Sequence, residues 1–202
     1  MPVRNTIRFD VDECFYHVYN RGINKQIIFH DDDDKEFFIN LLARYLAPES
    51  VIDQHGNIYK TYNNKLELLC YCLMDNHFHL MFYQNEKGVL KDYMQSIANS
   101  YIRYFNTKYE RRGPLFESRY KSLLIETQPY LEHITRYIHL NPKDWQTYKY
   151  SSLPYYLNEE SPEWFKPEKI LELFDGESYL EFMKDYEDHK AMLDEIKYEL
   201  AD

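Results

Sequence analysis

The run from Tyr71 to Phe82 places two histidines inside a stretch of strand-forming residues, and it constrains the fold more than any other part of the chain. Only Phe78 separates His77 from His79. Because side chains alternate between the two faces of a strand, we expect both imidazoles on one face, about 7 Å apart along the strand, with Phe78 in the opposite layer. Two such imidazoles can chelate one divalent cation. Two polar residues on the solvated face of a half-buried strand would give the same pattern.

Hydrophobic periodicity divides the first 157 residues into strands and helices. Strands are predicted at 14–20, 66–74, 77–83 and 119–126, and helices between 31 and 48, at 89–109 and at 129–141. The order strand, helix, strand, strand, helix, strand is the ferredoxin-like (RRM-like) arrangement of an α+β protein with an antiparallel sheet, and the last helix is an addition to it. Four aspartates, Asp31 to Asp34, open the first helix. They lack the spacing of a calcium loop, so we expect them to cap the helix.

Residues 158–202 differ from the rest of the chain in charge. They hold 15 acidic and 5 basic residues, a balance of −10 that equals the net charge of the whole chain. We therefore expect a main domain over residues 1–157 and an acidic helical extension over residues 158–202 that packs on it. The apolar residues expected to make this contact are Leu171, Phe174, Leu180 and Phe182.

The first 157 residues are neutral overall, but a segment within them is basic. Residues 103–121 carry six basic and two acidic side chains. This excess is compatible with phosphate binding, although chance clustering on a solvated surface explains it equally well. The basic residues are Arg103, Lys108, Arg111, Arg112, Arg119 and Lys121.

Cysteine usage and hydropathy indicate the cellular setting. Cys14, Cys70 and Cys72 are odd in number, lie in strand-like runs and lack the C-x-x-C spacing, so we expect reduced core residues. No apolar run reaches about 18 residues, and the N-terminus lacks the apolar core of a signal peptide. We therefore expect a cytoplasmic protein without a membrane segment.

The predicted helix at 129–141 could complete a site around the two histidines. Tyr137 and Asn141 are four residues apart and share one helix face. If this helix packs beside the third strand, a hydroxyl and an amide oxygen approach His77 and His79. Such a set could hold Mg²⁺ or Mn²⁺ with open positions for phosphate oxygens, while the phenolic oxygen attacks phosphorus. The alternatives are a tyrosine packed on the core and an asparagine at a helix end.

Four segments, in this order, resemble the REP-associated tyrosine transposases. These proteins belong to the HUH (histidine–hydrophobe–histidine) single-strand nucleases, within the single-tyrosine transposase group. The resemblance covers most of residues 14–157. The runs Tyr150-Ser151-Ser152, Pro162-Glu163-Trp164 and Leu171-Glu172-Leu173-Phe174 also look like the C-terminal part of the family. The four segments are Tyr16-His17-Val18-Tyr19-Asn20-Arg21-Gly22, Met74-Asp75-Asn76-His77-Phe78-His79-Leu80, Arg119-Tyr120-Lys121-Ser122 and Arg136-Tyr137-Ile138-His139-Leu140-Asn141-Pro142.

The resemblance implies a catalytic domain over residues 1–157 that recognises DNA hairpins and cuts single-stranded DNA, as a monomer or a homodimer. It implies Tyr137 as the nucleophile that forms a 5′-phosphotyrosine intermediate. It also implies His77, His79 and Asn141 as ligands of Mg²⁺ or Mn²⁺. The candidate DNA-contacting residues are Arg21, Arg103, Arg111, Arg112, Arg119 and Lys121.

Two other functions fit the same residues. One is a domesticated, catalytically idle nucleic-acid-binding module on the same fold. The other is a metal hydrolase with water as the nucleophile, in which Tyr137 is only structural. The joint presence of His77, His79, Tyr137 and Asn141 favours the active nuclease and strand transferase, because a pure binding module does not need all four. The acidic extension is unusual for a DNA-binding enzyme.

Overall fold

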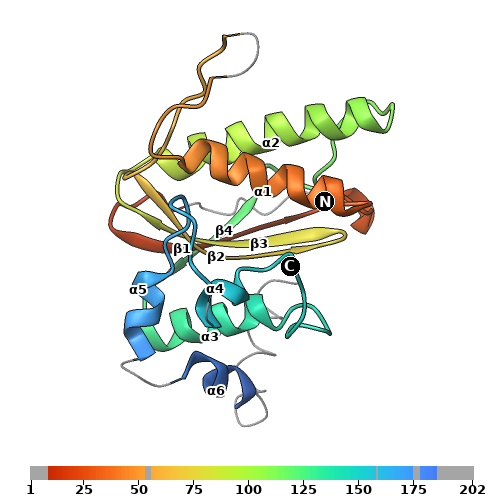
Figure 1. Ribbon diagram of the computed structural model, residues 1–202. Coiled ribbons are helices and arrows are strands. Elements are labelled where there is room, and N and C mark those ends of the chain that lie inside the picture. Colours follow the sequence, from red (N-terminus) through yellow and green to blue (C-terminus); the bar gives the residue numbers. More distant parts are fainter. Residues whose placement is uncertain (1–8, 53–55, 158, 175–177, 186–202) are drawn as a thin grey trace.

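A four-stranded antiparallel sheet forms the centre of the protein, with helices on both faces (Figure 1). The computed structural model describes residues 9–52, 56–157, 159–174 and 178–185. The strands are β1 (Cys14–Arg21), β2 (Leu66–Met74), β3 (His77–Gln84) and β4 (Lys121–Ile125). The helices are η1 (Ile23–Lys25), α1 (Asp32–Leu46), α2 (Val89–Lys108), α3 (Gln128–His139), α4 (Leu153–Leu157), α5 (Glu168–Leu171), η2 (Glu172–Phe174) and α6 (Tyr179–Lys184).

The sheet has the strand order β2-β3-β1-β4, and each neighbouring pair is antiparallel. Helix α1 connects β1 to β2, and α2 connects β3 to β4. In both cases the two connected strands are not neighbours in the sheet, because one other strand lies between them. This is the ferredoxin-like topology, and the predicted fold class is confirmed. The tight connection between β2 and β3 pairs Met74 with His77 and thereby sets the register of the histidine strand.

Helices α1 and α2 cover one face of the sheet (Figure 1). Aromatic side chains of both helices are buried in this layer. Phe38 of α1 and Tyr101 of α2 are both fully buried, and their rings meet edge to face at 5.0 Å. Phe78 of β3 points into this layer, where its ring lies 5.1 Å from that of Phe38. The predicted separation of Phe78 from the histidines on either side of it is therefore confirmed.

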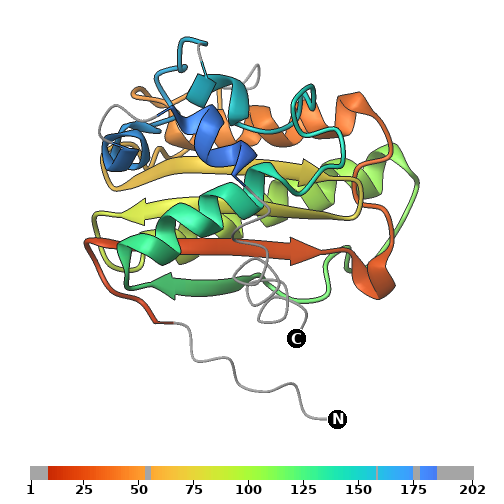
Figure 2. The ribbon, with the colours of Figure 1, turned by 90° about the horizontal axis from the view of Figure 1, so that it is seen from below.

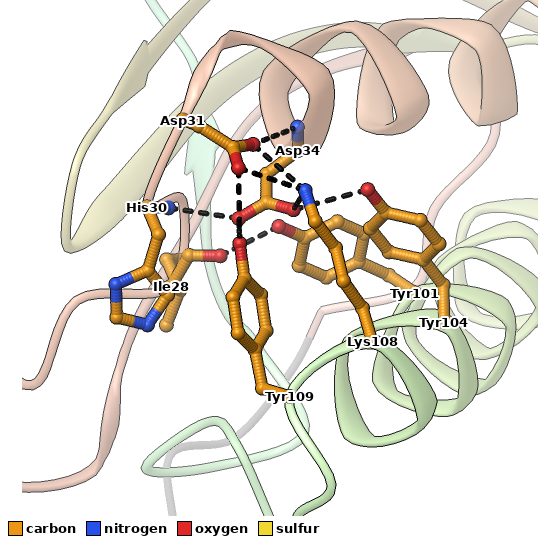
Figure 3. Close-up of polar contacts among 8 residues, drawn as sticks. All are labelled: Ile28, His30, Asp31, Asp34, Tyr101, Tyr104, Lys108 and Tyr109. Atoms are coloured by element: carbon orange, nitrogen blue, oxygen red, sulfur yellow. Dashed lines mark hydrogen bonds and ion pairs between the residues drawn. The ribbon is translucent and has the colours of Figure 1, made fainter.

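A polar cluster joins the start of α1 to the end of α2 (Figure 3). Asp31 is the N-cap of α1 and accepts a hydrogen bond from the Asp34 backbone N–H at 3.0 Å. The aspartate run caps the helix, as predicted from its position. The Asp34 carboxylate is completely buried and accepts four hydrogen bonds. The donors are the His30 backbone N–H and the side chains of Tyr104, Lys108 and Tyr109, at 2.8–3.0 Å.

Helix α3 crosses the other face of the sheet, as the view from below shows (Figure 2). It lies against β2 and β3, which is the position the proposed site requires. The helix ends at His139, two residues earlier than predicted, so Asn141 lies in the following turn and not on the helix itself. Pro142 is the physical reason, since a residue before proline is disfavoured in helical conformation.

The described part of the acidic extension lies on the same face as α3 (Figure 1). Phe165 is buried and forms a bridge to Leu68 of β2, and the Lys166 N–H donates to the Leu68 carbonyl at 3.0 Å. Of the four residues predicted to make the contact, Phe174 is buried, whereas Leu171, Leu180 and Phe182 are half-buried. Residues 175–177 and 186–202 lie outside the described part. The division of the chain at residue 157 stays a prediction.

The structure also bears on two expectations from the sequence, the state of the cysteines and the hydropathy of the helices. Cys70 and Cys72 are buried in β2, Cys14 is half-buried, and all three are free thiols, as predicted. In the described ranges, no helix combines the length and the apolar character needed to cross a membrane.

Candidate active site

A cavity of about 290 Å³ opens where β1 ends and β3 begins, on the side of the sheet that α3 covers. Residues from all three elements and from β4 converge on it, although they are far apart in the sequence. The side chains of chemical interest in its lining are Tyr19, Arg21, Lys25, His77, His79, Glu117, Lys121 and Tyr137.

His77 stands at the first position of β3, opposite Arg21 of β1. Its Nδ1 atom is hydrogen-bonded to Asn76 Oδ1 at 2.7 Å, and its Nε2 atom lies 3.0 Å from Asn141 Oδ1. The turn after α3 therefore reaches back to the histidine strand, and the predicted approach of Asn141 occurs from outside the helix.

His79 lies two residues further along β3 on the same face as His77, and only 3 % of its surface is exposed. Its Nδ1 atom lies 2.9 Å from Nε2 of His17, whose ring is nearly parallel to it, at 17°, with a centroid separation of 5.1 Å. Its Nε2 atom is buried and has no hydrogen-bond partner among the described residues. The ring of Tyr137 meets His79 edge to face at 5.4 Å.

The histidines of the site are held in the uncharged form. Burial lowers the pKa of His77, an effect that the hydrogen bond with Asn141 partly opposes. Burial lowers the pKa of His79 further, and that of His17 to about 3. At neutral pH these imidazoles therefore keep a lone pair, which a metal ligand requires.

Tyr137 is half-buried on α3, with its ring beside the histidine pair. Burial raises the pKa of its hydroxyl, and a hydrogen bond with Asn141 partly opposes this shift. The phenol is therefore protonated at neutral pH and would lose its proton only as it reacts.

Arg136 and His139, on either side of Tyr137 in the sequence, attach α3 to the C-terminal part of the described chain. Arg136 is fully buried, with its guanidinium 3.6 Å from the ring centroid of Phe182, and it donates to the Asp185 carbonyl at 3.1 Å. His139 is hydrogen-bonded to Ser152 and to Tyr179, both at 2.8 Å. These contacts hold the helix that carries Tyr137 against α6 and against Ser152.

The residues present fit a divalent cation. Among the described residues, no three His, Cys, Asp or Glu side chains form a metal-binding group, so the amide oxygen of Asn141 would have to complete the histidine pair. The 3.0 Å between His77 Nε2 and Asn141 Oδ1 matches the separation of about 3.0 Å between adjacent ligands of an octahedral ion with bonds of about 2.1 Å. The unpartnered Nε2 of His79 is a further available donor atom.

The structure brings two of the six candidate DNA-contacting residues to this cavity, namely Arg21 and Lys121. Arg21 is paired with Glu117 at 2.6 Å, and the ammonium of Lys121 lies 5.7 Å from the ring centroid of Tyr19. The other four lie elsewhere: Arg103 is exposed on α2, Arg111 lies over Phe105, Arg112 is exposed in the loop after α2, and Arg119 lines a separate cavity beside α2.

Sequence reasoning missed several residues of the site. His17 was not among the candidate site residues, yet it contacts His79 directly. Tyr19, Lys25 and Glu117 were not singled out at all, and all three line the cavity. Strand alternation does place His17 and Tyr19 on one face, but only the pairing of β1 with β3 shows that this face is the histidine face.

Comparisons with known proteins identify the family and the fold of the chain. The family model described as "Transposase IS200 like" matches residues 10–141. Among solved structures, the chain is similar to a REP-associated tyrosine transposase bound to a REP hairpin, at 13% identity and a TM-score of 0.53, over 76% of this chain and 84% of that chain. It is also similar to a candidate transposase from Deinococcus radiodurans R1, at 16% identity and a TM-score of 0.40, over 68% of this chain and 95% of that chain. No curated protein matches the chain.

Proposed function

The chain belongs to the family of IS200-like transposases, and from this membership we propose that it cuts and rejoins single-stranded DNA beside a hairpin through a covalent bond to Tyr137. One observation carries the proposal. His77 and His79 of β3 and Tyr137 of α3 line one cavity together with basic side chains, and Asn141, in the turn after α3, contacts His77. A hairpin is the proposed target because a solved structure of the same fold is described as bound to one.

The chemistry needs few groups. The phenolic oxygen of Tyr137 attacks the scissile phosphorus, a bond forms between them, and the bond from phosphorus to the 3′ oxygen breaks. The phenol loses its proton and the leaving 3′ oxygen gains one, so the products are a 5′-phosphotyrosine and a free 3′-OH. The phosphotyrosine conserves the bond energy of the phosphodiester, so rejoining by attack of a 3′-OH needs no ATP.

The other residues of the site bind and orient the DNA. His77, His79 and Asn141 would hold Mg²⁺ or Mn²⁺, which when bound neutralises charge on the scissile phosphate. Lys121 and Arg21 supply positive charge to neighbouring phosphates at the edge of the cavity. Packing against His79 and the hydrogen bond with Asn141 orient the Tyr137 ring.

The test is to trap the covalent adduct. Labelled single-stranded DNA with a hairpin and a single-stranded flank is incubated with the protein and Mg²⁺ or Mn²⁺, and the products are separated on a denaturing gel. The parent protein is expected to retain the label, and Tyr137→Phe, which removes one oxygen, is expected to lose it while hairpin binding persists. Tyr130→Phe, on the same helix and also half-buried, is the control and should retain the adduct.

The same gel separates the two alternative functions. Cleaved DNA without an adduct, unchanged in Tyr137→Phe, would assign the reaction to a water nucleophile. Hairpin binding with neither cleavage nor adduct would identify an idle binding module. An adduct that persists in Tyr137→Phe would show that another tyrosine is the nucleophile.

A further inference from the structure

His17 is completely buried on β1, where it stands opposite Met81 and contacts His79 diagonally across the strand pair, and it is not among the residues that line the cavity. Its Nε2 atom lies 2.9 Å from His79 Nδ1, and the two rings are nearly parallel, at 17°. The remaining ring nitrogens, Nδ1 of His17 and Nε2 of His79, are buried and have no hydrogen-bond partner among the described residues. The two rings therefore share one hydrogen bond and have a free nitrogen at each end.

Two uncharged imidazoles can make this hydrogen bond in only two ways. In the first, His79 Nδ1–H donates to His17 Nε2, and His79 Nε2 then carries a lone pair. In the second, His17 Nε2–H donates to His79 Nδ1, and His79 Nε2 then carries a hydrogen. Only the first arrangement leaves His79 able to bind a cation through Nε2, because a protonated ring nitrogen has no lone pair to offer.

We propose that His17 is a positioning residue that accepts the Nδ1–H of His79 and thereby directs the Nε2 lone pair of His79 toward a divalent cation. This inference rests on the cation site of the proposed function. Histidine ligands of metals generally donate their second ring N–H to a carboxylate, a backbone carbonyl or water, and here a neutral imidazole takes that place. The two rings lie edge to edge and nearly parallel, so the hydrogen bond also fixes the plane of the His79 ring.

A purely structural role for His17 makes a different prediction. His17 fills space in the core, and a leucine of similar size would also fill it. In His17→Leu, however, the Nδ1–H of His79 has no acceptor whenever His79 Nε2 binds a cation. Loss of such a partner typically weakens metal affinity by about 10- to 100-fold. In His17→Gln, the side-chain amide places an oxygen near the position of the original Nε2, so the acceptor is restored.

The experiment measures cation binding and not DNA cleavage. Mn²⁺ is titrated into the full-length protein, and free Mn²⁺ is counted by electron paramagnetic resonance, for the parent, His17→Leu, His17→Gln and a control. The control is Tyr16→Phe, which removes a hydroxyl that contacts Val11 from the adjacent position on the same strand. Thermal unfolding of each variant reports whether it is folded. Imidazole ¹⁵N shifts, recorded with and without Mg²⁺, report which nitrogen of His79 carries hydrogen.

The expected result is Mn²⁺ binding that is weakened about 10- to 100-fold in His17→Leu and recovers to within about threefold of the parent in His17→Gln. The control should bind like the parent, and Mg²⁺ should place the His79 hydrogen on Nδ1. A folded His17→Leu that binds Mn²⁺ like the parent would overturn the proposal, as would a His79 hydrogen on Nε2 in the Mg²⁺-bound protein.

Failure of this proposal can be distinguished from failure of the proposed function. A protein that binds Mn²⁺ with the expected dependence on His17, but forms no adduct with DNA, would leave the role of His17 intact and refute the nuclease. If the parent bound no Mn²⁺, both the cation site and the role of His17 would be refuted. If His17→Leu failed to fold, the ¹⁵N shifts of the parent and the Mn²⁺ affinity of His17→Gln would decide.

Discussion

The Nε2 atom of His77 and the Oδ1 atom of Asn141 lie 3.0 Å apart, although the two residues are separated by 64 positions in the sequence. One stands at the start of β3 and the other in the turn that follows α3. This contact joins the histidine strand to the segment that carries the candidate nucleophile, and it places an amide oxygen beside an imidazole nitrogen at the separation of two ligands of one ion.

Asn141→Ala is therefore expected to weaken Mn²⁺ binding by about tenfold or more, since it removes the only oxygen donor of the set. Asn141→Asp keeps an oxygen in the same place and should bind Mn²⁺ at least as tightly as the parent. Titration of both variants with Mn²⁺ checks this expectation. Equal affinity of the alanine variant and the parent would exclude Asn141 as a ligand.

Lys121→Ala is expected to weaken binding of single-stranded DNA and to lower its salt dependence, because Lys121 lies at the cavity. Loss of one phosphate contact should reduce the slope of log K against log salt by about 0.7 for a single strand. Arg103→Ala is the matched control, since Arg103 is exposed on α2 away from the cavity. Fluorescence anisotropy at several salt concentrations measures both slopes. Equal effects of the two substitutions would indicate a diffuse electrostatic contribution.

Asp34→Ala is expected to destabilise the protein by about 3 kcal/mol, because it removes a buried carboxylate that accepts four hydrogen bonds, one of them from a charged lysine. Asp33→Ala removes an exposed carboxylate from the same helical turn and should cost about 0.5 kcal/mol or less. Urea unfolding of both variants gives the comparison. Similar decreases in the free energy of unfolding at the two positions would show that the buried Asp34 carboxylate does not stabilise the protein more than an exposed one.

The stability contributed by the Asp31 charge should depend on pH. The hydrogen bond from Lys108 lowers the pKa of Asp31 below its ordinary value of 3.8. A carboxyl group whose pKa is lower in the folded state stabilises the protein above the unfolded pKa, and this contribution is lost as the pH falls through the folded pKa. Asp31→Asn keeps a good N-cap but removes the charge. The parent should therefore be the more stable of the two above about pH 4 and lose its advantage below it.

Urea unfolding of the parent and of Asp31→Asn between pH 2 and pH 7 measures this difference. Lys108 is the partner in question, so Lys108→Met should remove most of the pH-dependent difference. A difference between parent and Asp31→Asn that is constant across the whole range would mean that the cap geometry, and not the charge, is responsible.

Met183→Ala should report whether the acidic extension unfolds with the main domain. Met183 is fully buried on α6, and truncating such a side chain typically costs about 2–5 kcal/mol. Leu180→Ala, half-buried on the same helix, should cost clearly less. If the two parts form one cooperative unit, Met183→Ala lowers the midpoint of a single transition monitored by tryptophan fluorescence. A separate early transition of the extension would instead support an independent unit.

Local pattern was sufficient for most of the fold. Strand alternation placed His77 and His79 on one face and Phe78 on the other, and helical periodicity located α1 and α2 nearly to their ends. The order of the elements then left few topologies, and the ferredoxin-like sheet was among them. These features follow from interactions between residues that are close in the sequence, and they can therefore be predicted from local sequence patterns.

The end of α3 was less predictable. A four-residue spacing placed Tyr137 and Asn141 on one helix face, but the helix stops at His139, before the residue that precedes Pro142. The approach of Asn141 to His77 nevertheless occurs, because the turn folds back toward β3. The interpretation was right about the contact and wrong about the local structure that produces it.

By itself, the sequence determined the histidine face, the order of strands and helices and the small set of residues able to carry the chemistry. Only the tertiary structure decided which other residues join that face. The register of β1 against β3 sets Tyr19 opposite His79 and leaves His17 in diagonal contact with it. The position of β4 brings Lys121 to the cavity, whereas Arg103 lies on α2, away from it. Such contacts depend on how separate elements pair and pack, and no local periodicity encodes the distance between residues on different strands.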